Sequence, residues 1–76
     1  MIYSDGIHLI SDISIQDLHD FASQINIKRC WFHKGSKWPH YDIPKRRRAT
    51  FFEDNPSVIK CTSKDIVRIL KNGSLY

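Results

Sequence analysis

An imidazole, a phenol and a carboxylate stand side by side in His40-Tyr41-Asp42, just ahead of the basic run 45–48. Pro39 and Pro44 flank the triplet, and a proline fixes its own φ and disfavours the helical region for the residue before it. We therefore expect the triplet to be held rigidly. Imidazole and carboxylate groups transfer protons and bind cations, whereas arginine and lysine bind phosphate.

The positive charge is concentrated around this stretch. The whole chain of 76 residues carries a formal net charge of +4, but residues 28–48 hold eight Lys and Arg against the single Asp42, a net of +7. The remainder has four basic and seven acidic residues, a net of −3. Such a distribution favours binding of phosphate groups, nucleic acid or an acidic protein partner. The alternative is that these charges are only solvated and bind nothing.

Length and composition predict one domain spanning residues 1–76. With 41% hydrophobic and 26% charged residues, the chain is typical of soluble globular proteins. No apolar run reaches the roughly 20 residues that cross a bilayer, and the first residues lack a signal-peptide pattern, so we expect a cytoplasmic protein without a membrane partner. Cys30 and Cys61 form no paired motif and are expected to be buried free thiols.

Alternating strands and helices must position the triplet. Runs 2–4 and 7–10 are β-prone and separated by Asp5-Gly6, which favours a hairpin, with one bent strand as the alternative. A helix is expected from Ile15 to Gln24, capped by Ser14. The remaining elements are predicted as a strand over 27–33, a helix from 43–44 to about 53–56, a strand over 57–61 and a capped helix starting at 62–65.

This order, β(β)αβαβα, predicts an α/β fold with a small, mostly parallel sheet of three to four strands and three helices. In a parallel sheet the C-terminal ends of the strands share one edge, where ligands bind. Asp12, the loop 33–42 and Thr62 would then meet there. The candidate ligand-binding residues are His40, Tyr41, Asp42, Lys45, Arg48, Asp12 and Trp38.

Three functions are compatible with this candidate site. The first is binding of a phosphate-bearing ligand, either a nucleotide or nucleic acid, with Trp38 able to stack on a base. The second is a protein-interaction module whose basic loop meets an acidic partner. The third is a metal-dependent phosphoesterase, for which the potential ligands are His8, Asp12, His40 and Asp42.

The residues themselves assign no cofactor, metal or catalytic group. The spacing of the potential ligands matches no compact metal motif, and neither cysteine has a base assigned beside it, which argues against acyl-transfer chemistry. The structural alternative for the triplet is that His40 and Asp42 only lock a turn through hydrogen bonds.

Several segments resemble the bacterial and phage family called domain of unknown function 4031. They are His8-Leu9-Ile10-Ser11-Asp12, Asp17-Leu18-His19-Asp20-Phe21-Ala22, Trp31-Phe32, His40-Tyr41-Asp42-Ile43 and Ser63-Lys64-Asp65-Ile66-Val67. The family pattern maps onto Asp5, His8, Asp12, His19 and the triplet. The resemblance implies no established activity, and the joining of some members to metal phosphohydrolases of the HD type implies phosphate chemistry nearby. The chain departs from the pattern in a shortened 5–7 loop and in Asn55-Pro56, which replaces a glycine.

Overall fold

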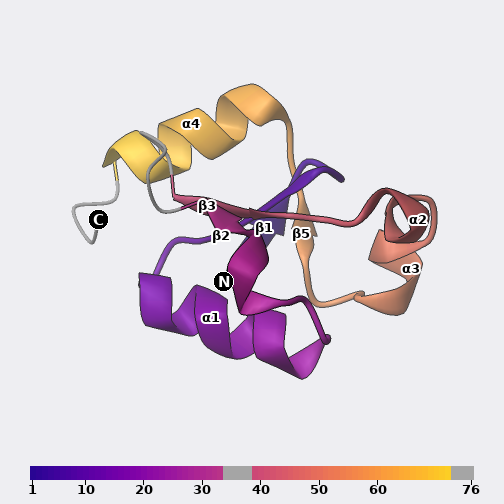
Figure 1. Ribbon diagram of the computed structural model, residues 1–76. Coiled ribbons are helices and arrows are strands. Elements are labelled where there is room, and N and C mark those ends of the chain that lie inside the picture. Colours follow the sequence, from indigo (N-terminus) through magenta and orange to yellow (C-terminus); the bar gives the residue numbers. More distant parts are fainter. Residues whose placement is uncertain (34–38, 73–76) are drawn as a thin grey trace.

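A computed structural model describes residues 1–33 and 39–72, without the side chain of Asn72, and places one sheet between helices (Figure 1). Five strands form the sheet within these residues, in the order β3-β4-β2-β1-β5. Their bounds are β1 Ile2–Ser4, β2 His8–Ser11, β3 Phe32–His33, β4 His40–Asp42 and β5 Ile59–Lys60.

The prediction of a mostly parallel sheet with three to four strands and three helices is wrong, although the α/β class is correct. β1 pairs with β2, β2 with β4, and β3 with β4 in antiparallel fashion, and the parallel pair is β1 with β5. Residues 5–7 connect β1 to β2, and residues 34–39 connect β3 to β4. Both connections are too short for a crossover of a dozen or more residues, which a parallel pair needs.

Four α-helices are present in the described part of the chain. α1 spans Ile15–Gln24 and α4 spans Ser63–Asn72, while α2, Lys45–Arg48, and α3, Phe51–Asp54, are single turns. The predicted bounds of α1 are confirmed, and the Ser14 hydroxyl accepts a hydrogen bond from the Asp17 amide, as an N-cap does. A 3₁₀ turn, η1, covers Arg29–Trp31.

Two other expectations about elements need correction. The strand predicted over 27–33 is reduced to β3, because η1 occupies the preceding residues. The helix expected to run to about 53–56 is interrupted at Thr50, between α2 and α3. Cys30 is exposed and Cys61 partly exposed, so the expectation that both thiols are buried is also wrong.

The two faces of the sheet carry different side chains, because neighbouring residues of a strand point to opposite sides. One face packs on α1 and contributes Leu9 and Tyr41 to the main core. The other face packs on α4, where Ile10 meets Ile66 and Leu70. Figure 1 shows α1 and α4 on opposite sides of the sheet.

No helix in residues 1–33 and 39–72 is both long enough and apolar enough to cross a bilayer.

Candidate functional site

Three histidines and an aspartate gather on the α4 face of the sheet, beside the part that α4 covers. They come from three neighbouring strands: His8 on β2, His40 and Asp42 on β4, and His33 on β3. The register sets His8 opposite Asp42 and His33 opposite His40. Directly paired residues on one face lie within contact distance, so the strand pairing alone brings these four side chains together. We call them the histidine cluster.

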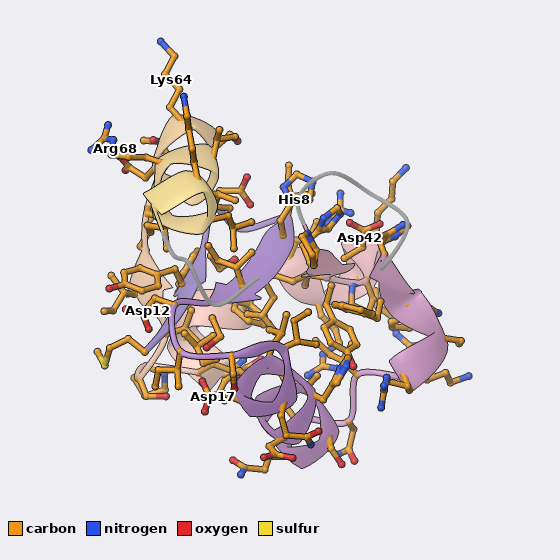
Figure 2. All side chains as sticks on the ribbon, turned by 90° about the vertical axis from the view of Figure 1, so that its left-hand side faces the viewer. His8, Asp12, Asp17, Asp42, Lys64 and Arg68 are labelled. Atoms are coloured by element: carbon orange, nitrogen blue, oxygen red, sulfur yellow. The ribbon has the colours of Figure 1, made fainter. Side chains whose placement is uncertain are left out.

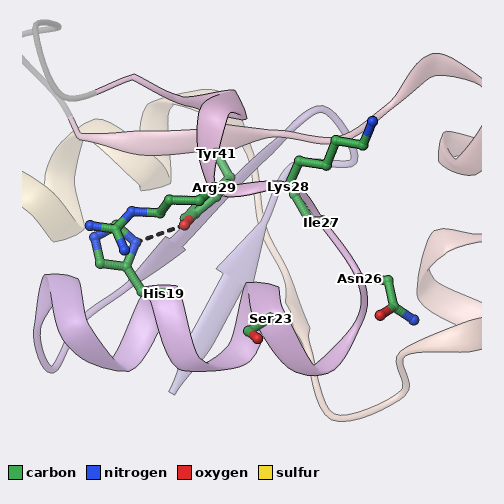
Figure 3. Close-up of a pocket in the computed structure, with 7 residues that line it drawn as sticks. All are labelled: His19, Ser23, Asn26, Ile27, Lys28, Arg29 and Tyr41. Carbon is green, nitrogen blue, oxygen red and sulfur yellow. Dashed lines mark hydrogen bonds between the residues drawn. The ribbon is translucent and has the colours of Figure 1, made fainter.

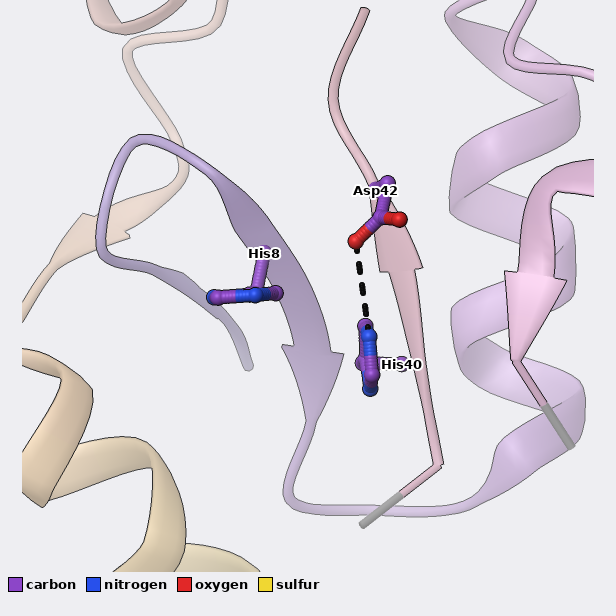
Figure 4. Close-up of side chains that lie close together, drawn as sticks. All are labelled: His8, His40 and Asp42. Carbon is purple, nitrogen blue, oxygen red and sulfur yellow. Dashed lines mark ion pairs between the residues drawn. The ribbon is translucent and has the colours of Figure 1, made fainter. Parts of the chain in front are cut away.

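The geometry within the histidine cluster is close. The ring centroids of His8 and His40 are 5.0 Å apart with perpendicular planes, and those of His33 and His40 are 4.9 Å apart and stacked. His33 Nε2 lies 2.6 Å from Asp42 Oδ2, and His40 Nε2 lies 3.4 Å from Asp42 Oδ1. Figure 4 shows His8, His40 and Asp42 turned toward one space between β2 and β4.

Asp5 supports the cluster from the β1–β2 loop. Its Oδ2 atom lies 2.9 Å from His8 Nδ1 and accepts a 2.7 Å hydrogen bond from the Ser63 hydroxyl. Its Oδ1 atom accepts hydrogen bonds from the amides of Ile7 and His8. Burial alone would raise the pKa of Asp5, but these hydrogen bonds outweigh it and hold that pKa well below its ordinary value. Asp5 is therefore an ionised carboxylate although its side chain is only 5% exposed.

A pocket of about 330 Å³ adjoins the cluster on the side of β3 and α2. Two members of the cluster, His33 and Asp42, line it together with Lys45 and Arg48 from α2. Its other lining residues are Cys30, Trp31, Ile43 and Pro44. The pocket thus brings together three of the residues predicted from the sequence: Asp42, Lys45 and Arg48.

Tyr41 lies on the opposite face of the sheet from His40 and Asp42. Its ring is 1% exposed and its hydroxyl lies 2.7 Å from His19 Nδ1. These two residues line a separate pocket of about 410 Å³ with Arg29 and others (Figure 3). Burial, with the nearby positive charge of Arg29 adding to it, lowers the pKa of His19, while burial raises the pKa of Tyr41.

Asp12 does not join the histidine cluster. It follows β2, which runs opposite to β1, β4 and β5, so it lies at the other edge of the sheet. Its carboxylate contacts the Met1 amino group at 2.9 Å and the Tyr3 hydroxyl at 3.3 Å. Figure 2 shows Asp12 well apart from His8 and Asp42. The predicted convergence fails for Asp12 because the sheet is not parallel.

Two residues of the basic run 45–48 bond to backbone carbonyls, and the other two are exposed to solvent. Arg47 Nη2 donates a 2.7 Å hydrogen bond to the Ile25 carbonyl, which ties α2 to the end of α1. Arg48 Nε donates to the Ile43 carbonyl at 2.9 Å. Lys45 and Arg46 are exposed. Trp38, predicted as a stacking residue, lies outside the described residues.

Sequence reasoning gave Asp5 no role beyond a turn and the family pattern, and it treated His8 as part of that pattern and as a potential metal ligand, without pairing the two residues. The contact between the Asp5 carboxylate and the His8 imidazole could have been predicted from the spacing Asp5-Gly6-Ile7-His8. A glycine two residues before a strand, here with φ of +95°, allows the loop to fold back so that the carboxylate reaches the next imidazole.

The chain belongs to the family described as protein of unknown function (DUF4031), whose model matches residues 5–72. No curated protein and no solved structure matches the chain.

Proposed function

Starting from a family whose description assigns no activity, we propose that this chain binds a phosphate-bearing ligand of the nucleotide class. The ligand occupies the pocket between β3, β4 and α2. The observation that carries the proposal is the presence of two cationic side chains, Lys45 and Arg48, and an indole, that of Trp31, in the lining of one pocket.

The two cations suit a phosphate group. The guanidinium of Arg48 is oriented by the hydrogen bond from its Nε atom to the Ile43 carbonyl, and this bond does not use its two terminal nitrogens. Those nitrogens form the pair that binds phosphate oxygens in a bidentate manner. Lys45 lies one turn earlier on α2 and adds a compact ammonium to the same wall. Asp42 lines this pocket as well, and its Oδ2 atom is in contact with His33 Nε2 at 2.6 Å.

The indole suits a base. Trp31 lines the pocket and is only partly buried, so part of its side chain is accessible. Stacking of a base on an aromatic side chain contributes about 1 to 3 kcal/mol. The pocket volume of about 330 Å³ is at the lower end of the range for small-molecule sites, roughly 300 to 1,000 Å³, which favours a mononucleotide over a larger ligand.

Calorimetric titration with ADP and with adenosine tests the proposal. We expect ADP to bind and adenosine to bind far more weakly, because the phosphates supply the charged contacts. Lys45→Gln should weaken ADP binding about tenfold or more, since a hydrogen bond to a charged group contributes roughly 1.5 to 3 kcal/mol. Affinity should also fall as salt rises from about 50 to about 300 mM.

Arg46→Gln is the matched control, because Arg46 is exposed on the same helix but does not line the pocket. This variant removes the same formal charge and should change ADP affinity less than about twofold, as expected for a solvent-screened contact. Equal weakening by both substitutions would mean that diffuse charge attracts the nucleotide, and equal affinity for adenosine and ADP would remove the phosphate from the proposal.

A further inference from the structure

We propose that His8, His40 and Asp42 bind a divalent transition-metal cation of the Zn²⁺ class. This site goes beyond the nucleotide pocket and does not depend on it, because two of its three ligands, His8 and His40, do not line that pocket. One potential ligand atom from each of the three residues can be chosen so that all lie within 4.8 Å of one another.

The spacing is close to what a metal needs. At a Zn–N distance of about 2.0 to 2.1 Å, two ligands of a tetrahedral ion are about 3.3 Å apart. His40 Nε2 and Asp42 Oδ1 are already at 3.4 Å. The His8 ring stands perpendicular to the His40 ring at a centroid distance of 5.0 Å, and its ligand atom lies within 4.8 Å of those of His40 and Asp42. The antiparallel pairing of β2 with β4 places His8 directly opposite Asp42, so the sheet holds the backbones of these two ligands side by side.

The donor set selects the class of metal. Two imidazoles with one carboxylate suit Zn²⁺ and other first-row transition ions, whereas Mg²⁺ and Ca²⁺ prefer sites built from oxygen atoms. Three protein ligands leave a fourth position for water or a ligand, as in catalytic rather than structural zinc sites. The exposed fractions of the His8 and Asp42 side chains, 37% and 41%, leave that position open to solvent.

Asp5 prepares His8 to act as a ligand. The Asp5 Oδ1 atom accepts the amides of Ile7 and His8, and its Oδ2 atom lies 2.9 Å from His8 Nδ1, so this geometry favours the tautomer with hydrogen on Nδ1. The lone pair is then on Nε2, the ring nitrogen that this contact does not use. A carboxylate behind the histidine is the usual support of a metal-binding imidazole, and Ser63 in turn holds Asp5.

His33 orients the carboxylate ligand in a similar way. Its Nε2 atom contacts Asp42 Oδ2 at 2.6 Å, which leaves Oδ1 on the side of His40. The His33 ring also stacks on the His40 ring with an interplanar angle of 16°. The site therefore has ligands from β2 and β4 and supporting groups from the β1–β2 loop and from β3.

Calorimetric titration of the chelator-treated full chain with ZnCl₂ alone, without nucleotide, tests the proposal. We expect one ion per chain and no comparable binding of Mg²⁺. His40→Gln and Asp42→Asn should each weaken Zn²⁺ binding by more than about a hundredfold, and Asp5→Asn by about 10- to 100-fold, as loss of an outer-shell partner does. All titrations use a Cys30→Ser background, because Cys30 is exposed beside the cluster and could bind zinc through sulfur.

Asp12→Asn is the control matched to Asp42→Asn, because it removes a carboxylate at the opposite edge of the sheet. It should leave Zn²⁺ affinity unchanged within about twofold. Absence of Zn²⁺ binding by the Cys30→Ser chain, in which His8, His40 and Asp42 are all unaltered, overturns the proposal. Retention of stoichiometric binding in folded Asp42→Asn, checked by circular dichroism, also overturns it. Because the titration contains no phosphate ligand, its failure is distinct from failure of the ADP titration.

Discussion

At the scale of single residues, the buried pair of His19 and Tyr41 shows how one face of the sheet uses polar groups for stability. The His19 ring is 9% exposed and packs edge-on against Phe32 and Tyr41. Burial lowers the pKa of His19, which favours the neutral imidazole, and its Nδ1 atom lies 2.7 Å from the Tyr41 hydroxyl. This pair is part of the core rather than of the candidate metal site.

The lowered pKa of His19 predicts a pH-dependent stability. The unfolded chain binds a proton at this histidine near its ordinary pKa of 6.5, while the folded state resists protonation. The contribution is therefore fully present above that value and is lost as pH falls below it. Urea unfolding between about pH 7.5 and pH 5 should show a decreasing free energy of unfolding.

His19→Asn provides the comparison, because the asparagine amide can occupy the place of Nδ1 without titrating. This variant should be less stable at pH 7.5 but should lose less stability on acidification than the natural chain does. The same acid sensitivity in both proteins would show that His19 is not the group responsible.

The residues of the candidate site were predictable as chemical types but not as neighbours. His40 and Asp42 are separated by one residue, so either a strand or a rigid turn places both on one side. The partners of these two residues depend on strand register, which no local pattern near them specifies. Asp12 is a second example. The sequence correctly predicted that Asp12 follows a strand, but it did not predict the direction in which that strand runs in the sheet.

At the scale of elements, β4 is the strand around which the site is built. Its three residues lie between β2 and β3 and expose His40 and Asp42 on one face and bury Tyr41 on the other. Pro39 and Pro44 flank it, and both favour extended backbone in the residue that precedes them. The sequence indicated a rigid triplet for this reason, but so short a strand with two charged or polar residues lacks the β-branched pattern that identifies strands.

The N-terminus of α4 connects this helix to the site. Thr62 and Asp65 cap it reciprocally: the Asp65 amide donates to the Thr62 hydroxyl, and the Thr62 amide donates to the Asp65 carboxylate, both at 3.1 Å. Ser63, the first residue of the helix, donates its hydroxyl to Asp5. The start of α4 thus fixes the carboxylate that lies behind His8.

Thr62→Ala should lower the free energy of unfolding by about 1 kcal/mol, because the cap is lost. Thr50→Ala is the matched control, since Thr50 precedes α3 but makes no capping bond and only contacts the exposed Asp54 carboxylate. A pair of this kind contributes about 0.2 to 0.5 kcal/mol. Urea unfolding of both variants measures the difference, and equal losses would contradict the assigned cap.

Helices were more predictable than strands for a physical reason. The bounds of α1 and the start of α4 follow from local signals, namely capping residues and apolar side chains at helical spacing. Pairing of strands depends on contacts between distant segments, such as β1 with β5, and on whether the connections are long enough for a crossover. The hairpin predicted at Asp5-Gly6 is confirmed by the antiparallel pairing of β1 with β2, whereas the pairing of β3 with β4 was missed because β4 was not predicted as a strand.

At the scale of the molecule, the two faces of the sheet differ: one holds the larger core and the other carries the candidate metal site. The α1 face holds the larger core, including Leu9, Tyr41 and Phe51. The α4 face is covered by a smaller apolar cluster at β1 and β2, and its remainder carries the histidine cluster. Within that cluster the side chains of His8, His33 and Asp42 are 37%, 49% and 41% exposed, so this part of the face is accessible to a ligand.

The direction of the strands explains which distant residues meet. β1, β4 and β5 run the same way, so the chain leaves all three at one edge of the sheet and brings Asp5, Asp42 and Ser63 to that side. β2 and β3 run the opposite way, which is why His8 at the start of β2 joins the cluster and Asp12 after its end does not.

The central claim is that His8, His40 and Asp42 form one metal-binding site on the α4 face, while His19 on the other face does not take part. Nuclear magnetic resonance of the ¹⁵N-labelled imidazoles during addition of Zn²⁺ tests it most directly. We predict large shifts of the ring nitrogens of His8 and His40 that saturate at one ion per chain, with the His19 signals unchanged. Unmoved His8 and His40 signals, or equal shifts of every histidine, would contradict the claim.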